Sequence, residues 1–421
     1  MARSIVRFVA IVLLGLGSVS AGADDVISTR CREVELALNA RHSVALLEGC
    51  GEGYSADLLW NLDRIDQIAP RLDGTFDRRN SGAGSVVYVM DTGVLASHDE
   101  FKTATGSRVM TGFDTSASVV IGTSPCRSAN KSTEPCYESV DELTTASHGT
   151  AVASIVAGRN VGVAPGALLV SVRVMNERGL ATTRTYLEGL NAIISHAWAP
   201  TTNPFDTAVV NISGWVLERL SSASSDSSPV VRFAEVEQKI RDMVGGVASD
   251  GRPDGNGKRF LFVVAANNID GGCGINGVVD RFPAVLGKKI DGVITVGGMT
   301  IDNRWWFGSC RGGIEVLAPA QGIFSATITA TNHYRGRKPN MRSGTSFAAP
   351  IISGIAARLL ADRHDLTPQQ IEAWISSTPS RIENADRTFA DGKVAYVRSI
   401  APRPASARVA AGVRLAEEPL R

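Results

Sequence analysis

Short uninterrupted apolar runs alternate along the chain with longer segments that are amphipathic or built from small residues. Runs of this length without polar interruptions predict strands that are buried on both faces of a parallel sheet. We expect these strands at 85–94, 167–175, 207–213, 259–268, 292–297 and 313–317. The amphipathic and small-residue segments predict helices at 147–158, 182–198, 230–244, 346–360 and 366–377.

Strands that alternate with helices predict an α/β fold whose mostly parallel sheet is covered by helices on both faces. In such sheets ligands bind beyond the carboxyl ends of the strands. Three expected strands end in polar residues, namely Asp91, Ser213 and Asn268. The stretch 102–147 is polar and rich in Ser and Thr, and we expect it to be an inserted surface loop region.

One expected helix has apolar or small residues on every side from Phe347 onward, which indicates burial inside the domain. Proline is tolerated in a first helical turn, so Pro350 places the start of the helix close to Ser346. Unpaired N–H groups and the positive end of the helix dipole would then favour negative charge near Ser346. This is a suitable position for a nucleophile, although a serine there can also act simply as a helix cap.

The first 23 residues follow the layout of a secretory signal. Arg3 and Arg7 precede the apolar run 8–16, and Ala-Gly-Ala at 21–23 offers a cleavage site. The apolar run is too short to span a bilayer. We therefore expect export, with the mature chain secreted or periplasmic.

The remaining chain divides by composition into three parts. Residues 24–55 predict a short pro-region or covering segment, because they are too few to form a domain alone. Residues 56–401 carry the strand and helix pattern and form the expected main domain. Residues 402–421 lack any core-forming pattern and predict a disordered tail.

Composition narrows the choice of partners. The chain has 421 residues, of which 44% are apolar, and 43 Lys and Arg balance 42 Asp and Glu. No basic block or stripe is present, so we expect no nucleic-acid partner. We also expect no membrane association once the signal is removed, and a monomeric chain.

The six cysteines form an even set, as expected for disulfides in an exported protein. Fifteen pairings are possible. We favour the sequential one because its first two pairs close short loops, and the third pair is what remains. The expected bridges are Cys31–Cys50, Cys126–Cys136 and Cys273–Cys310. No clustered Cys/His spacing suggests a zinc site.

The candidate nucleophile needs a neutral imidazole to accept its proton and a carboxylate to orient that imidazole. Of the six histidines, His148 alone is followed by glycine and by the start of a helix. Asp91 lies at the end of a strand and could supply the carboxylate. Considered separately, His148 could be a helix-capping or core histidine, and Asp91 could merely form a turn.

The motifs DTG at Asp91, HGT at His148 and GTSFAAP around Ser346 occur in this order along the chain. Together they resemble the subtilisin family of serine proteases, and its proteinase K-like branch in particular, over roughly 60–401. The resemblance implies a three-layer αβα fold. It also implies a secreted endopeptidase that acts on polypeptides through an acyl-enzyme, with Asp91 as orienting carboxylate, His148 as general base and Ser346 as nucleophile.

The resemblance further implies an oxyanion site and a substrate groove. Asn268 takes the place of the family's oxyanion asparagine, but Asn267 precedes it where the family usually has glycine, so Asn267 must adopt a conformation easy for glycine. Substrate would bind as an added strand. Its expected contacts are Gly179, Leu180 and Ala181 on one side, and Ser213, Gly214 and Trp215 on the other. Trp215 stands where the family has glycine in the pocket wall.

The resemblance implies no cofactor for the chemistry, whereas structural calcium is common in the family. The residues that match one such site are Asp291 and Val293, through their carbonyls, and Glu315. Acidic residues on a surface are, however, more often merely solvated.

Two rival functions are compatible with parts of the pattern. DTG is also the motif of aspartic proteases, which need two copies, but Asp114-Thr115-Ser116 lacks the glycine. The other rival is a catalytically inactive binding protein that keeps the subtilisin fold.

Overall fold

The structure is a computed structural model that describes most of the expected main domain. The described residues are 43–45, 59–69, 71–116, 147–176, 179–199, 204–216, 229–270, 273–274, 277, 279–328, 334–335, 342–382 and 393–394. The expected signal at 1–23, the tail at 402–421 and most of 24–55 lie outside these residues. The expected Cys31–Cys50 and Cys126–Cys136 bridges lie outside them as well.

Seven strands form one sheet in the order β11-β10-β9-β8-β3-β7-β6, and every neighbouring pair is parallel. The strands are β3 (Val86–Asp91), β6 (Val109–Asp114), β7 (Leu168–Arg173), β8 (Thr207–Ile212), β9 (Arg259–Ala265), β10 (Val293–Met299) and β11 (Val316–Pro319). The expected parallel sheet is therefore confirmed.

The central strands read as uninterrupted apolar runs because both faces of these strands are covered. In β3 every residue is buried. Val87 and Val89 belong to the hydrophobic cluster on one face, while Tyr88 and Met90 belong to the cluster on the other. Successive side chains of a strand point to opposite faces, so a strand with two covered faces has no polar position.

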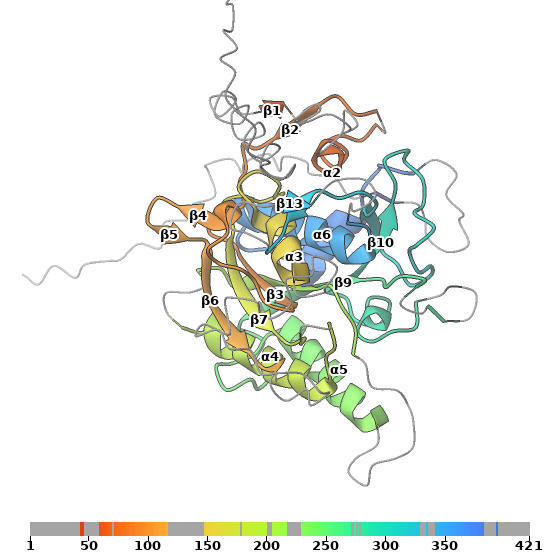
Figure 1. The fold of residues 1–421 in the computed structure, drawn as a ribbon. Coiled ribbons are helices and arrows are strands. Elements are labelled where there is room, and N and C mark those ends of the chain that lie inside the picture. Colours follow the sequence, from red (N-terminus) through yellow and green to blue (C-terminus); the bar gives the residue numbers. More distant parts are fainter. Residues whose placement is uncertain are drawn as a thin grey trace, which may run out of the picture.

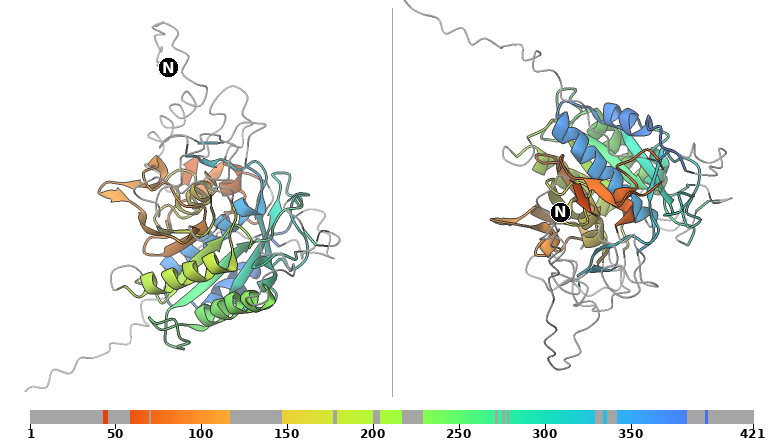
Figure 2. Two further views of the ribbon diagram at one scale, coloured as in Figure 1. Left: turned by 60° about the horizontal axis from the view of Figure 1, so that its bottom comes forward. Right: turned by 90° about the horizontal axis from the view of Figure 1, so that it is seen from above.

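Helices cover the two faces as separate layers (Figures 1 and 2). The layer on one face consists of α3 (His148–Ala157), α6 (Thr345–Asp362) and α7 (Pro368–Ser376). The layer on the other face consists of α4 (Thr183–Ala197) and α5 (Pro229–Gly245). The three-layer αβα arrangement expected from the sequence is confirmed.

The starts of two helices follow from local sequence. Thr182 caps α4 and Thr367 caps α7, each through a capping box in which the threonine side chain accepts a hydrogen bond from the backbone N–H three residues on. This contact satisfies one of the N–H groups that a helix start leaves unpaired. The helix start predicted at Thr367-Pro368 is confirmed.

Two expectations about local structure are wrong. The stretch 102–147 is not simply a surface loop, because its described part contains β4 (Lys102–Thr103), β5 (Gly106–Ser107) and β6. β6 lies at the edge of the sheet, and only Val109 at its start is fully buried, so its sequence reads as polar. Pro350 does not lie in the first turn of α6, because that helix already begins at Thr345.

The described N-terminal part packs on the same domain. α2 (Trp60–Asp63) is buried, and β2 (Thr75–Asp77) pairs with β1 (Ser43–Ala45) in an antiparallel ribbon. The remaining short elements are η1 (Asp99–Phe101), η5 (Ala284–Leu286), β12 (Ser325–Ala326) and β13 (Tyr334–Arg335). Among the residues described, no helix has both the length and the apolar character needed to cross a membrane.

Candidate active site

The candidate residues gather at one edge of the sheet. Asp91 ends β3, Ser213 follows β8 and Asn268 follows β9, and these three strands are neighbours in the sheet. Because all strands are parallel, their carboxyl ends meet at the same edge, as the sequence indicated. His148 begins α3 and Ser346 is the second residue of α6, both in the layer that packs on this sheet.

Asp91 and His148 form the central contact. The imidazole Nδ1 of His148 lies 2.8 Å from Asp91 Oδ1 and 3.0 Å from Oδ2. The Asp91 side chain is fully buried, whereas that of His148 is 20% exposed. An ionised carboxylate can only accept hydrogen bonds, so Nδ1 donates and Nε2 is left as an acceptor. Asp91 Oδ1 also accepts the N–H of Thr92 at 2.7 Å.

The glycine after His148 is needed for this approach. A Cβ on Gly149 would lie 2.3 Å from the carbonyl oxygen of Gly93 and 3.2 Å from Cβ of Asp91. The N–H of Gly149 donates to Thr92 Oγ1 at 3.0 Å. The HGT and DTG motifs therefore pack against each other directly, and a side chain at 149 would push His148 away from its carboxylate.

Ser346 is not the cap of α6, since Gly344 takes that position. Its hydroxyl donates to the carbonyl oxygen of Ser213 at 3.1 Å. Pro350 has no N–H, so the carbonyl of Ser346 lacks its usual helical partner four residues on and accepts the Ser213 hydroxyl at 2.9 Å instead. Two reciprocal hydrogen bonds thus join Ser346 and Ser213. In this structure the Ser346 hydroxyl faces Ser213 rather than His148.

Asn268 is held by the residue before Ser346. Its Oδ1 accepts both the backbone N–H of Thr345, at 3.0 Å, and the Thr345 hydroxyl, at 3.1 Å. These contacts orient the amide so that its NH₂ group faces away from Thr345. Asn267 has φ of 79°, the left-handed conformation that its replacement of glycine predicted. Asparagine tolerates this region better than most residues.

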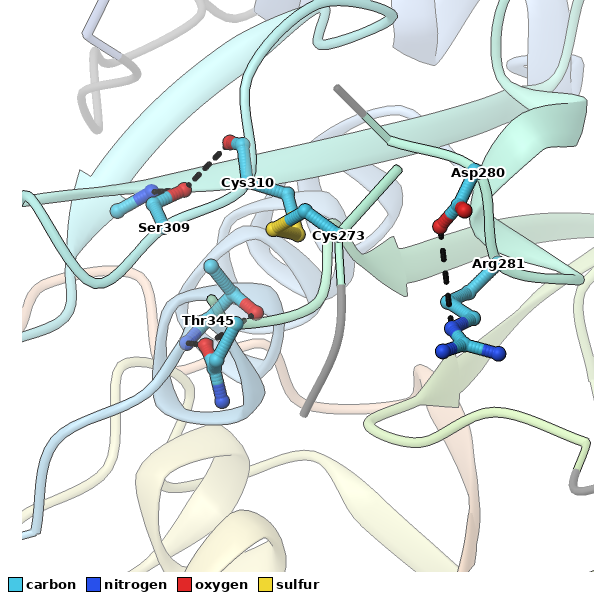
Figure 3. Close-up of a disulfide and its surroundings, with 8 residues drawn as sticks. Cys273, Asp280, Arg281, Ser309, Cys310 and Thr345 are labelled. Carbon is cyan, nitrogen blue, oxygen red and sulfur yellow. Dashed lines mark hydrogen bonds and ion pairs between the residues drawn. A yellow bond between two sulfur atoms is a disulfide. The ribbon is translucent and has the colours of Figure 1, made fainter. Parts of the chain in front are cut away.

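A disulfide joins Cys273, five residues after Asn268, to Cys310 (Figure 3). Cys273 and Cys310 are bonded, with 5.6 Å between their Cα atoms, which confirms the third expected pair. Close to this bond the N–H of Cys310 donates to the carbonyl of Asn267 at 3.0 Å, and Asn268 forms an antiparallel bridge with Ser309. The covalent link and these backbone contacts join the segment of Asn268 to the segment of Cys310.

The two segments expected to flank substrate lie close to each other. Gly179 has φ of 71°, and the N–H of Leu180 donates to the side chain of Asn176 at 3.0 Å. Beyond this turn Ala181 forms a parallel bridge with Val216. At this position the two segments therefore pair with each other, and the backbone of Ala181 is already bridged within the protein.

Gly214 and Trp215 lie between Ser213 and this bridge. A Cβ on Gly214 would lie 2.1 Å from Cε of Met175, so a side chain there would have to displace the flexible end of that methionine. Trp215 is half-buried.

The residues expected to hold calcium lie at the opposite, amino end of the strands. Glu315 Oε2 accepts the N–H of Thr295 at 2.6 Å, while its buried Oε1 has no hydrogen-bond partner. Burial raises the pKa of Glu315 to about 7. The carbonyl of Asp291 accepts Gln369 Nε2 at 3.3 Å. Within the described ranges, no three His, Cys, Asp or Glu side chains form a metal-binding group.

The unpaired Oε1 of Glu315 nevertheless fits a hard cation. Calcium takes oxygen ligands, and carboxylate and carbonyl oxygens are the donors that the matching residues offer. A cation here would need main-chain carbonyls in addition to the one carboxylate.

Fold and site together define a subtilisin-like three-layer α/β protein with a candidate Asp–His–Ser triad at the carboxyl edge of its sheet. Residues 82–394 match the subtilase family, and the chain belongs to that family. A crystal structure of a cold-adapted subtilisin-like serine proteinase superposes with a TM-score of 0.58 at 26% identity, covering 82% of this chain and all of the other.

Relatives with similar sequences are named as serine proteases. The chain is 30% identical to an extracellular serine proteinase of a Thermus species over 78% of its length, which is 63% of that protein. It is 28% identical to alkaline serine exoprotease A of Vibrio alginolyticus over 82% of its length, which is 51% of that protein. The matched part is thus less than two thirds of each relative.

The sequence did not predict a cluster of three buried residues next to the candidate triad. Arg342 contacts both Ser147 and Phe347 there. An arginine just before the GTSFAAP motif, in a stretch that leads into a buried helix, was the available clue.

Proposed function

We propose that the protein is a secreted serine endopeptidase that hydrolyses polypeptides through an acyl-enzyme on Ser346. The observation that carries this proposal is the hydrogen bond between the buried carboxylate of Asp91 and His148 Nδ1, beside the helix start that bears Ser346. Family membership and the names of the relatives support it.

The first step is proton removal from Ser346. Rotation of its side chain away from the Ser213 carbonyl turns the hydroxyl toward His148 Nε2, which has a free lone pair because Nδ1 carries the proton. His148 accepts the proton as Ser346 Oγ attacks the peptide carbonyl, and Asp91 stabilises the imidazolium that forms. His148 then protonates the leaving amine, and water releases the acyl group by the same path in reverse.

Negative charge on the attacked oxygen needs donors that are already in place. The Ser346 N–H lies in the first turn of α6, where N–H groups lack helical acceptors. Asn268 NH₂ is the second donor, since Thr345 occupies the oxygen of that amide. Rotation of the Ser346 hydroxyl also frees the Ser213 carbonyl, which can accept an N–H from the substrate residue on the acyl side.

Trp215 shapes the pocket for that residue. With a half-buried indole in place of glycine, we propose a shortened pocket that favours small side chains such as Ala. No cofactor enters the chemistry. Where calcium binds, Glu315 and the carbonyls of Asp291 and Val293 would hold it, and its role would be to stabilise the fold.

Digestion of casein by the purified protein, with mapping of the cleaved bonds, tests the proposal. We expect cleavage at internal bonds that a serine-directed phosphonate blocks and a statine peptide does not. Inhibition by the statine peptide alone would indicate an aspartic protease. Absence of both cleavage and phosphonate labelling would indicate a catalytically inactive binding protein.

A further inference from the structure

We propose that Arg342 is a positioning residue for His148, which it holds through Ser147 on one side and Phe347 on the other. The proposal rests on the proposed function, because it assigns a role toward the same imidazole. Arg342 lies two residues before the GTSFAAP motif that carries Ser346, and Ser147 immediately precedes His148. Its guanidinium thus joins the two segments that must bring nucleophile and base together.

The hydrogen bond between Arg342 and Ser147 takes the place of the usual N-cap hydrogen bond of a serine. Ser147 occupies the N-cap position of α3, where a serine hydroxyl ordinarily accepts a hydrogen bond from its own helix. Here the side chain makes no such bond. Its hydroxyl instead accepts from Arg342 Nη2 at 2.7 Å, and both residues are buried. The start of α3, and with it His148, is therefore tied to the Arg342 side chain.

The contact with Phe347 reaches the imidazole itself. The guanidinium carbon of Arg342 lies 5.8 Å from the centre of the Phe347 ring, within the range of a cation–π contact. The same ring lies 5.4 Å from the centre of the His148 ring. Phe347 therefore contacts both the guanidinium and the imidazole, and we expect it to limit the tilt of the His148 ring.

The backbone of Arg342 is fixed independently of its side chain. Arg342 forms an antiparallel bridge with Ile323, whose N–H donates to the Arg342 carbonyl at 2.8 Å. A change of the side chain alone should therefore leave the course of the chain toward Ser346 intact. It removes the link to Ser147 and Phe347.

The charge of Arg342 adds an electrostatic effect. The imidazole faces Asp91 at the end of β3, and Arg173, which is in register with Asp91, is paired with Asp114 Oδ2 at 3.6 Å. The Arg342 guanidinium contacts the same phenyl ring as the imidazole, and its positive charge should oppose protonation of the imidazole. Its removal should move the acid limb of the pH–rate profile to higher pH, by about half to one pH unit.

Arg342→Met, Arg342→Lys and Ser147→Ala test the proposal against the matched control Arg358→Met. Arg358 is a buried arginine over a phenylalanine ring, Phe76 at 5.2 Å, but it lies further along α6 and bonds to backbone carbonyls away from the site. The measurements are kcat and KM for a peptide anilide across pH, the thermal midpoint, and the NMR titration of the His148 ring, which needs no turnover.

For Arg342→Met we expect kcat to fall about 10- to 100-fold with little change in KM. The acid limb of the pH–rate profile and the midpoint of the His148 NMR titration should both move to higher pH. Arg342→Lys should keep the acid limb at its wild-type position. Ser147→Ala should lower kcat less, and it should have no further effect in the Arg342→Met background. Arg358→Met should lower the thermal midpoint while leaving the acid limb where it is.

An Arg342→Met protein that behaves like the Arg358→Met control would overturn the proposal. Should Arg342→Met not fold, Ser147→Ala with wild-type kcat would overturn it as well. A wild-type protein without turnover contradicts the proposed function alone. In that case the His148 titration still decides. An unchanged titration midpoint with normal ring mobility in Arg342→Met, or normal ring mobility in Ser147→Ala where Arg342→Met does not fold, overturns the positioning role.

Discussion

Both ends of the central sheet hold carboxylates, and the groups around these carboxylates differ. At the carboxyl end, Asp91 accepts from the His148 ring and from the N–H of Thr92. At the amino end, Glu315 accepts one backbone N–H and keeps a second, buried oxygen without a partner. Glu372 accepts the N–H of Gly292 nearby.

The different surroundings of the carboxylates at the two ends of the sheet suit one end to catalysis and make the other end important for stability. A carboxylate whose partners are complete can stabilise a charge that appears on an adjacent ring, which is useful for catalysis. A buried carboxylate with an unfilled oxygen makes folding less favourable when it is charged, unless a cation binds. Substitutions at the carboxyl edge should therefore change rates, and substitutions at the amino edge should change stability.

The largest effect should come from the base. His148→Ala removes the group that takes the Ser346 proton, so kcat should fall by about 10⁶, with a remnant of ~10³ over the rate in water from the oxyanion site and binding. The thermal midpoint should barely change. Single-turnover kinetics on a peptide anilide and calorimetry provide the two readings, and retained turnover would remove His148 from the mechanism.

The next effect belongs to the oxyanion amide. Asn268→Ala should lower kcat by roughly 10² to 10³ with little change in KM, because the amide binds charge that is present mainly in the transition state. Steady-state kinetics measures the split. A rise in KM at constant kcat would show that Asn268 only binds substrate.

The disulfide links rate and stability at the carboxyl edge. Replacement of both Cys273 and Cys310 by serine should destabilise the fold by about 2 to 4 kcal/mol, because the bridge restricts the unfolded chain. Denaturant unfolding measures this loss. Since the same bond anchors the Asn268 loop, kcat should fall as well, and an unchanged kcat would show that the loop holds its shape unaided.

At the amino edge Glu315→Gln should act on stability and depend on pH. Burial raises the pKa of Glu315 to about 7 from an ordinary 4.5, so the folded state binds its proton more tightly than the unfolded state. This stabilising contribution is present below pH 4.5 and is lost as pH rises to 7. The variant should therefore melt higher than wild type at pH 8, by roughly 3 °C or more, and show no such gain at pH 4.5.

Thermal scans at the two pH values test this, with the half-exposed Asp280→Asn as a control that should show no pH-dependent difference. Excess calcium sharpens the test. If Glu315 holds the ion, calcium raises the thermal midpoint of wild type but not of Glu315→Gln. Equal stability of wild type and variant at both pH values would contradict the account of the amino edge.

The smallest effect concerns specificity. Trp215→Gly should widen the pocket and shift the ratio of kcat/KM for Phe over Ala anilide substrates by about 1 to 3 kcal/mol. The overall rate on the best substrate should change little. A wild-type protein that already prefers Phe would rule out a blocking indole.

The sequence predicted the strands of the sheet other than β6 and supplied the residues of the candidate triad, because both depend on local signals. Buried parallel strands read as apolar runs, and the close packing of Gly149 on Asp91 requires glycine in the motif itself. β6 was missed because only one face of an edge strand needs apolar residues. The contact of Arg342 with Ser147 could not be predicted, since it joins residues 195 positions apart.

Covalent labelling of Ser346 tests the central claim most directly. After incubation with a serine-directed phosphonate, peptide mass spectrometry should find the adduct on Ser346 in the wild-type protein and almost none in His148→Ala, because the hydroxyl reacts only when the imidazole removes its proton. An adduct on another serine, or equal labelling of Ser346 in both proteins, would contradict the account.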